Sequence, residues 1–393
     1  MLRACLGSAK LAYALRGLAP SDRVLTVLRD ADEVLRLAFE KIIGDSVSAA
    51  AWKQAGLRPS MGVLGLRHAE DIAAPAFMGS TVETSELSVR LLNKESLAVP
   101  GLQQAAQDYI ANARHAQVPL STGLLVSVLA TGLIDMDLAQ RTPKKVQAAL
   151  QEPIDDKDYE TLKYSVGGNG RDRLEAVRRT HASAWISCFP NKNMGLHMPA
   201  REFRVACRSW LGLTSRVEAK AMLKPGIAMY GRHHAIQECL LSLCRSAGVP
   251  AKREILIDNS GQRPADVFLP NFSQGQPVAA DVTVSHPSQA PPNPSDGAAP
   301  TLSASERAAL VKSDLKNRKY KTQCDARGVA FMPVVVCSFG GWLPEGEELV
   351  HELANRSASR SGRDVATTKA QFWERLSIAL WRGNARQLLH CLW

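Results

Sequence analysis

The sequence predicts a mixed α+β or α/β protein, with a mostly helical N-terminal region, a small α/β domain at residues 231–345 and a helical C-terminal tail at 346–393. Apolar residues recur at three- and four-residue spacing through the first 160 residues, which predicts helices. Three short runs rich in β-branched residues follow residue 250, which predicts strands. A chain of 393 residues also exceeds the size at which a single hydrophobic core stops growing, so we expect two or three domains.

The composition excludes two broad classes of protein. An apolar content of 45% and a charged content of 22% are typical of globular proteins, so a wholly disordered chain is not expected. No run approaches about 18 consecutive apolar residues, so we expect no membrane span and no membrane partner. The eight cysteines form no CxxC pair, and we identify no secretory signal. Reduced thiols in a nuclear or cytoplasmic protein are therefore expected.

Residues 1–163 are predicted to be helical. The segment SDRVLTVLRDADEVLRLAFEKIIG (21–44) has helical periodicity, and Ser21 is a good N-cap residue. The basic segment at 1–20 is also compatible with a mitochondrial transit peptide, but its pattern continues into helical sequence, which favours a folded helix. The glycine-rich run YSVGGNGRD (164–172) predicts a loop at a domain boundary. A second helical region follows at 164–230.

The α/β domain at 231–345 is predicted from alternating helix and strand signals. A helix at 233–247 ends at Gly248, a natural C-terminal cap. Strands are expected in REILIDN (253–259), RPADVFLP (263–270) and QPVAADVTVS (276–285). A proline-rich loop at 286–302, a basic helix from about Ser303 to Arg327 and a buried strand in FMPVVVCSFGG (331–341) complete the order helix, three strands, helix, strand.

Two aspartates face each other in the hairpin that these strands predict. Pro270 and Pro277 bracket NFSQGQ (271–276), which centres the turn between Ser273 and the next residue. Pairs then have residue numbers that sum to 547, and Asp266 lies opposite Asp281. A slip of one residue would place the two side chains on opposite faces. Loop positions facing water at opposite sheet edges are the other alternative.

An opposed pair of carboxylates requires compensation, because like charges on neighbouring strands are destabilising. A shared proton, a basic partner or a divalent cation would each provide it. Mg²⁺ prefers one or two carboxylates together with water and phosphate oxygens, so Asp266 and Asp281 are candidate ligands for Mg²⁺ or Mn²⁺. Glu254, on the preceding strand, is a candidate third acid. Lys316 and Lys319 are three residues apart on the basic helix. A lysine beside a bound phosphate can orient or activate a water molecule, and either of the two is a candidate for this role.

The net charge of +10 and the pI of about 9.3 are consistent with a polyanionic partner, most commonly nucleic acid. Two histidines, His233 and His234, lie near Cys239 and Cys244, which raises the possibility of zinc. Their spacing matches no common zinc ligand set. We therefore interpret the two histidines as core or surface residues of the first helix.

Several motifs together resemble one known family. They are RPAD (263–266), DVTV followed by HP (281–287), KNRKY (316–320) and FMPVVVCSFGGW (331–342). This combination resembles the restriction-enzyme-like endonuclease of non-LTR retrotransposons, a variant of the PD-(D/E)xK nuclease fold. Upstream segments resemble the region between the polymerase core and the nuclease in such elements: LRACLGSAK (2–10), LAYALRGLAP (11–20), RPSMGVLGLR (58–67), AWISCFPN (184–191) and FRVACRSWLGL (203–213).

The resemblance implies metal-dependent nicking of target DNA, with Asp266 and Asp281 as metal ligands. Thr283 stands where simpler family members carry the catalytic lysine, so Lys316 or Lys319 would replace it. DNA, and possibly element RNA, would be the partners. Phosphate contacts are expected from Arg232, Arg263, Arg318 and Lys321.

Two departures from the family pattern favour an alternative. The segment at 211–237 has no cysteine, so the zinc knuckle that usually precedes the nuclease is missing, and no polymerase catalytic motif occurs upstream. The alternative is a relic of the same fold that binds nucleic acid without cleaving it.

Overall fold

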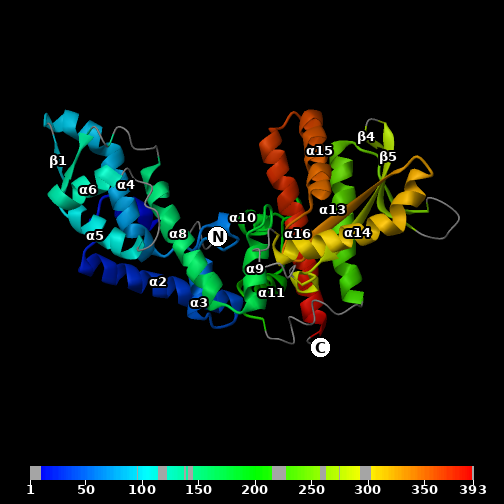
Figure 1. The fold of residues 1–393 in the computed structure, drawn as a ribbon, viewed down its shortest axis with the longest axis horizontal. Helices are drawn as coiled ribbons and strands as arrows, with labels where there is room; N and C mark the ends of the chain where they lie inside the picture. Colours follow the sequence, from blue (N-terminus) through cyan, green and yellow to red (C-terminus); the bar gives the residue numbers. More distant parts are fainter. Residues whose placement is uncertain are drawn as a thin grey trace. The chain divides into compact units, whose positions relative to one another are not determined.

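The computed structural model describes residues 10–94, 96–113, 122–136, 139, 145–214, 227–256, 263–273, 275–292 and 302–391. The chain forms two compact units, Met1–Ser165 and Val166–Trp393 (Figure 1). Their boundary lies two residues beyond the expected end of the helical region. Apart from residues 164 and 165, the expected segments 164–230, 231–345 and 346–393 belong to the second unit. No helix in the described part of the chain is long and apolar enough to cross a bilayer.

The first unit is mainly helical, as its periodicity predicts. Its long helix α2 begins after Ser21, whose hydroxyl accepts a hydrogen bond from the Val24 N–H at 3.4 Å, and the helix ends at Gly44 in the left-handed region. The elements of this unit are α1 (Leu11–Leu15), α2 (Asp22–Ile43), α3 (Ala49–Gly56), η2 (Pro59–Met61), α4 (Ala69–Leu92), β1 (Leu97–Ala98), α5 (Leu102–Ala113), α6 (Thr122–Thr131), β2 (Leu133–Ile134) and α8 (Val146–Ser165).

The glycine-rich run at 164–172 is not the loop that the sequence predicts. Helix α8 continues to Ser165, and after a break of two residues α9 (Gly168–Val177) begins with Gly167 as its N-cap. Glycine costs about 1 kcal/mol in a helix relative to alanine. Tertiary burial outweighs this cost, because Leu174 and Val177 of the same helix are fully buried.

The second unit is built around a four-stranded sheet. Strands β3 (Lys252–Ile255), β4 (Ala265–Ser273) and β5 (Gln276–Ser285) pair antiparallel, and β6 (Ala330–Cys337) pairs parallel to β5. The order helix, three strands, helix, strand is therefore present. The helices and turn of this unit, besides α9, are α10 (Ala184–Ser187), α11 (Ala200–Leu211), α13 (Ile227–Ala247), η3 (Pro287–Gln289), α14 (Ala304–Asp325), α15 (Pro344–Ser361) and α16 (Val365–Cys391).

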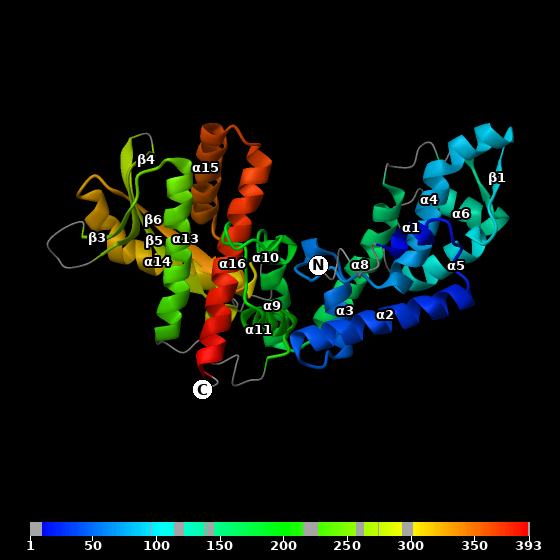
Figure 2. The same cartoon turned by 180° about the vertical axis from the view of Figure 1, so that it is seen from behind.

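The sheet separates two apolar layers (Figures 1 and 2). Helices α13, α15 and α16 cover one face, where side chains such as Leu240, Val267 and Leu353 form the larger core. Helix α14 covers the other face through Tyr320 and Cys324, which contact Ala279 and Phe331. Because α14 connects the parallel pair β5 and β6, it lies over these two strands and can direct its polar residues towards β5. The tail is helical as expected, and Trp373 and Trp381 are buried in it.

Local sequence explains why these elements begin and end where they do. Helix α14 starts with a capping box, in which the Ser303 hydroxyl accepts from the Glu306 N–H while the Glu306 carboxylate accepts from the Ser303 N–H. Helix α13 ends before Gly248, whose φ of +68° suits a residue without a side chain. The predicted loop at 286–302 contains η3, and its residues 293–301 lie outside the described residues.

The hairpin register predicted from the two prolines is confirmed. The pairs Val267–Ala280, Phe268–Ala279 and Leu269–Val278 all have numbers that sum to 547. The turn itself lies one residue further along the chain, since the pair at the tip is Ser273–Gln276. An irregularity between Leu269 and Ser273 absorbs the difference, so the strands enter the site in the expected register.

Two glycines in the helices of the second unit are expected to respond in opposite ways to alanine. A Cβ at Gly383 in α16 would lie 2.8 Å from the Cα of Arg232, whereas a Cβ at Gly231 in α13 would meet no atom within 4 Å. Helix propensity favours both substitutions by about 1 kcal/mol. Gly231→Ala should therefore raise the free energy of unfolding, and Gly383→Ala should lower it by about 1–3 kcal/mol, because two backbones must separate. Urea unfolding of the two variants tests this, and stabilisation by both would contradict the close packing of α13 on α16.

Candidate functional site

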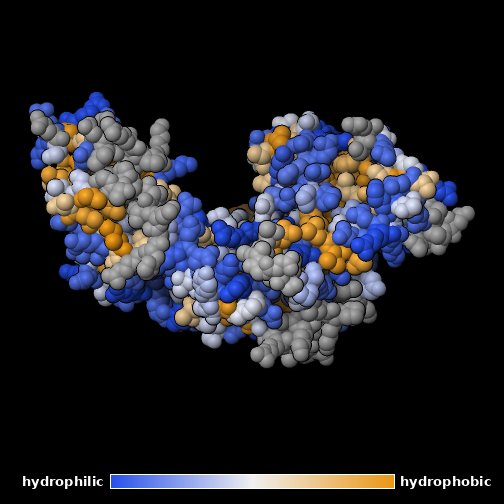
Figure 3. Space-filling model, in the orientation of Figure 1, coloured by the Kyte–Doolittle hydropathy of each residue, from blue (hydrophilic) through white to orange (hydrophobic). Residues whose placement is uncertain are grey.

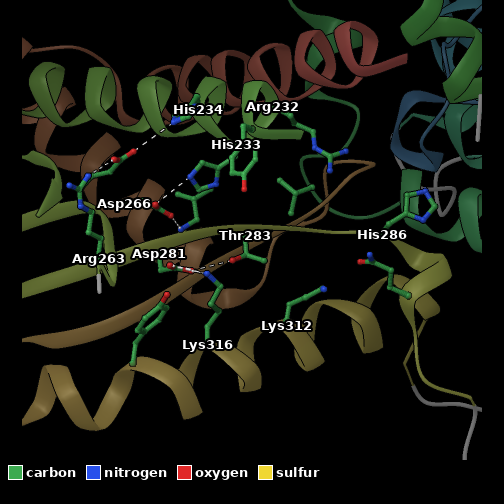
Figure 4. Close-up of a pocket in the computed structure, with 16 residues that line it drawn as sticks. Arg232, His233, His234, Arg263, Asp266, Asp281, Thr283, His286, Lys312 and Lys316 are labelled. Atoms are coloured by element: carbon green, nitrogen blue, oxygen red, sulfur yellow. Dashed lines mark hydrogen bonds and ion pairs between the residues drawn. The ribbon is translucent and has the colours of Figure 1, made fainter. Parts of the chain in front are cut away.

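A cleft of about 600 Å³ opens between α13, the strands β3 to β5, η3 and α14 (Figure 4). It contains the predicted carboxylates and an excess of basic side chains. The carboxylates are Glu254, Asp266 and Asp281, and the lysines and arginines are Arg232, Arg263, Lys312 and Lys316. Three histidines, His233, His234 and His286, also line it. The cleft is therefore polar and charged, with cations and anions from α13, β3, β4, β5 and α14.

Asp281 lies on the central strand β5, and it is only 3% exposed. Its Oδ2 lies 2.7 Å from the Lys316 Nζ, which also donates to Oδ1 at 3.0 Å. The Thr283 hydroxyl donates to Oδ2 at 3.2 Å. Burial raises the pKa of Asp281, and the charge of Asp266 raises it further, while Lys316 and Thr283 act in the opposite direction. The balance is a raised pKa in a carboxylate that depends on one lysine for its counter-charge.

Asp266 lies on β4, and the hairpin register places it opposite Asp281. Its Oδ2 accepts a hydrogen bond from the Val282 N–H at 2.7 Å, and its Oδ1 lies 3.3 Å from His233 Nε2. Gln237, one turn further along α13, donates to the Asp266 carbonyl at 2.8 Å and fixes the strand against the helix. A shared proton, a basic partner or a divalent cation could each compensate the opposed carboxylates. The described side chains provide basic partners, Lys316 for Asp281 and His233 for Asp266.

Asp266 also changes the protonation of His233. Burial lowers the pKa of His233, but the hydrogen bond and charge of Asp266, together with the charge of Asp281, outweigh that effect and raise the pKa above its usual value. The imidazolium form therefore persists to higher pH than in an unperturbed histidine.

Glu254, the third acid, lies on the edge strand β3 between the residues that pair with Ala265 and Val267. It has a φ of +44°, which is unusual for a residue with a side chain. Its carboxylate lies 3.3 Å from Arg263 Nη1 and 3.7 Å from His234 Nε2. Within the described residues, no group of three or more His, Cys, Asp or Glu side chains is arranged to hold a metal ion. Asp266 and Asp281 therefore form a pair, and Glu254 is neutralised separately by its own basic partners. The three acids do not form a three-ligand metal site.

The structure distinguishes between the two candidate lysines. Lys316 lies in the cleft on Asp281, whereas Lys319 lies outside it, with its Nζ 4.8 Å from the centre of the Tyr320 ring. Three residues turn a helix by roughly 300°, so the two lysines share a face only in part. Lys312, one full turn before Lys316, also lines the cleft. The four-residue spacing of Lys312 and Lys316 therefore places both side chains in the cleft, whereas the three-residue spacing of Lys316 and Lys319 does not.

Of the four residues predicted to contact phosphate, two lie in the cleft and two lie outside it. Arg263 lies in the cleft in its pair with Glu254, and Arg232 lies in the cleft wall with only 5% of its surface exposed. Arg318 and Lys321 lie on the exposed side of α14, where Lys321 pairs with Asp325 at 3.4 Å. Exposed apolar side chains gather over the N-terminal half of this helix, among them Leu310, Val311 and Leu315 (Figure 3).

The sequence interpretation missed the histidines. His233 and His234 were expected as core or surface residues, yet both line the cleft and both contact acids. The signal lies in the four-residue spacing of His233 and Gln237, which puts two polar side chains on one face of α13. That face meets β4, so polar residues there require polar partners.

The third histidine, His286, is expected to make stability depend on pH. Burial first, and the charge of Arg232 second, lower its pKa to about 4. Between pH 6.5 and 4 the unfolded chain binds this proton and the folded chain does not, so stability rises with pH across that window. His286 Nδ1 accepts from the Ser288 N–H, a role that asparagine can assume. In His286→Asn, the loss of unfolding free energy between pH 6.5 and 4 should shrink by about 2 kcal/mol. Urea titrations at both pH values measure it, and an unchanged loss would contradict the buried neutral imidazole.

The sequence matches no protein-family model, and no curated protein is significantly similar to it.

Proposed function

We propose that the chain is a metal-dependent DNA endonuclease that uses a PD-(D/E)xK-type site. The observation that carries this proposal is the meeting of Asp266 and Asp281, from adjacent strands in the register predicted by the sequence, with Lys316 on the second carboxylate. The order of elements around the sheet and the resemblance of RPAD, DVTV and KNRKY to the retrotransposon endonucleases support the same assignment.

The donor set suits Mg²⁺ or Mn²⁺. Mg²⁺ is commonly bound through one or two carboxylates and completes its shell with water and substrate phosphate oxygens, so a cage of protein ligands is not required. The Lys316 ammonium, 2.7 Å from the Asp281 carboxylate, supports this point of the cleft as a position for a cation. Asp266 and Asp281 would hold the ion. When bound, it would supply activation of water and stabilisation of charge on the leaving oxygen.

Each neighbouring side chain has a role that follows from its position. Lys316 comes from the helix that covers the cleft, and its Nζ can pass from the Asp281 carboxylate to a phosphate oxygen or an attacking water without leaving the site. His233 can donate from Nε2 to Asp266, which keeps that carboxylate oriented. Arg263 lies at the exposed end of the cleft and is available to a phosphate when its pair with Glu254 opens.

One observation favours a second candidate function, the binding of nucleic acid without cleavage. Each carboxylate of the pair already has a basic partner, and the described acids form no three-ligand group. A cleft of this kind can bind a phosphate backbone through its cations alone. The two functions separate in their dependence on Asp281, since only cleavage requires the carboxylate.

Divalent metal is expected to stabilise the folded chain through Asp281. Binding to the folded state alone raises the melting temperature by mass action, so Mg²⁺ and Mn²⁺ at millimolar concentration should raise it in the wild type. Asp281→Asn should remove that rise. Asp314→Asn, an exposed acid on α14 outside the cleft, is the matched control and should keep it. Equal rises in all three proteins, measured by thermal denaturation, would place the metal elsewhere.

A further inference from the structure

Two cations in the cleft lack an acidic partner among the described residues. Arg263 pairs with Glu254 and Lys316 pairs with Asp281, whereas Arg232 and Lys312 form no ion pair there. Both unpaired cations, with His286, lie on the side of the carboxylates opposite to Arg263 (Figure 4). The surplus positive charge is therefore concentrated at one end of the cleft.

Arg232 is held in this position by contacts that no surface arginine requires. Its Nη1 donates to Asn384 Oδ1 at 3.0 Å, and Asn384 is fully buried. The orientation of that amide is fixed, because its Nδ2 donates to the Ser338 carbonyl at 2.7 Å. Gly383 allows the close approach, since a Cβ there would lie 2.8 Å from the Arg232 Cα. Three residues from two other segments thus position one guanidinium.

The same guanidinium retains an unsatisfied donor. Arg232 is 5% exposed, and its Nε is buried without a hydrogen-bond partner. Burial lowers the pKa of Arg232 to about 10, which leaves it charged at neutral pH. The Nε atom itself has almost no accessible surface, so a ligand in the cleft would meet the exposed part of the guanidinium, and an anion there would offset the cost of burying the charge. The forked geometry of a guanidinium suits a phosphate in particular.

His286 and Lys312 complement this donor. His286 Nδ1 accepts from the Ser288 N–H, which leaves the proton of the neutral imidazole on Nε2. Lys312 comes from α14 and adds a second positive charge. The three groups come from α13, from the residue that follows β5 and from α14, and all three line the cleft.

We propose that Arg232, Lys312 and His286 form a second phosphate subsite. It binds one phosphodiester of the nucleic acid strand, while the carboxylate pair binds a different phosphodiester of the same strand. The identification of the phosphate as part of a nucleic acid rests on the proposed function. The binding of phosphate itself needs neither metal nor cleavage. The subsite extends the path of the strand to one side of Asp266 and Asp281, where its three side chains lie.

Inorganic phosphate is the first probe, used with the full chain, without divalent metal, and at an ionic strength matched with chloride. Phosphate should raise the melting temperature of the wild type above the chloride value. Arg232→Lys keeps the buried charge but removes the fork, and Lys312→Gln removes the second charge; each should weaken phosphate binding about tenfold. Lys369→Gln, on α16 and outside the cleft, should bind as the wild type does. Equal binding by all four proteins, or no phosphate-specific rise in the wild type, would overturn the proposal.

Asp281→Asn separates this inference from the proposed nuclease. It should retain phosphate binding even if every metal effect is lost, and loss of phosphate binding in this variant would move the phosphate to the carboxylate pair and refute a separate subsite. A short DNA duplex identifies the source of the phosphate. Lys312→Gln should lower the slope of the logarithm of DNA affinity against the logarithm of salt concentration by about one, the value for one phosphate contact. An unchanged slope with weakened inorganic phosphate binding would assign the subsite to a free phosphate and overturn the nucleic acid assignment.

Discussion

Lys316→Met should lower the free energy of unfolding by about 3 kcal/mol at pH 8, because it leaves a buried carboxylate without its counter-charge. Asp281 is 3% exposed, and its two oxygens lie 2.7 and 3.0 Å from the lysine nitrogen. Methionine keeps most of the length and apolar surface of the lysine stem, so the loss reports charge more than packing. Urea unfolding of the wild type and the variant measures it.

The reverse substitution is expected to cost less. In Asp281→Asn the lysine loses its partner, but its side chain is 29% exposed and can turn its ammonium towards water. The carboxylate in Lys316→Met has no such route. The double variant Lys316→Met/Asp281→Asn should recover most of the stability, since no buried charge remains. A double variant as unstable as Lys316→Met would show that the loss comes from packing.

The loss in Lys316→Met should also depend on pH. Burial already raises the pKa of Asp281, and removal of the lysine raises it further. The folded state then holds a proton that the unfolded chain has released, so stability falls as pH rises between the two pKa values. The variant should be closer to the wild type at pH 5 than at pH 8, and a pH-independent difference would contradict a charge effect.

The sequence predicts the hairpin well because several local signals agree. The prolines at 270 and 277 each lack an N–H donor and bracket the turn, and the alternation of apolar residues fixes which side chains face the core. The position of the turn was predicted one residue too early, yet the register at Asp266 was right. A bulge can be accommodated in the strand, whereas a change of register at the site would turn every apolar side chain outward.

Other parts of the site could not be predicted from local sequence. The spacing of His233 and Gln237 indicates a polar face of α13, but whether His233 meets a carboxylate depends on how α13 packs across β4, which the local sequence does not specify. The choice between Lys316 and Lys319 depends on the rotation of α14 over β5, which its buried contacts to Ala279 and Phe331 determine. The arrangement of Arg232, Gly383 and Asn384 joins residues about 150 positions apart. Only tertiary packing brings such groups together.

Asp281→Asn should reduce metal-dependent DNA cleavage by about 10²- to 10³-fold, comparable with the removal of a direct electrostatic stabiliser in other active sites. Asparagine has nearly the same shape as aspartate, and the lysine beside it can reach water, so the variant should remain folded. The carboxylate charge, which in the proposed site would hold the metal ion together with Asp266, is lost. Unchanged DNA affinity at low salt would show that the substitution acts on cleavage and leaves binding intact.

Nicking of supercoiled plasmid DNA with Mg²⁺ or Mn²⁺ at low salt is the most direct test of the carboxylate pair as a nuclease site. Wild type, Asp281→Asn and the exposed control Asp314→Asn should be compared at equal concentration. The account predicts nicking by the wild type and the control, and its loss in Asp281→Asn. Equal nicking by all three, or no nicking by a wild type that still binds DNA in a salt-dependent way, would contradict it, and the second outcome would leave a cleft that only binds nucleic acid.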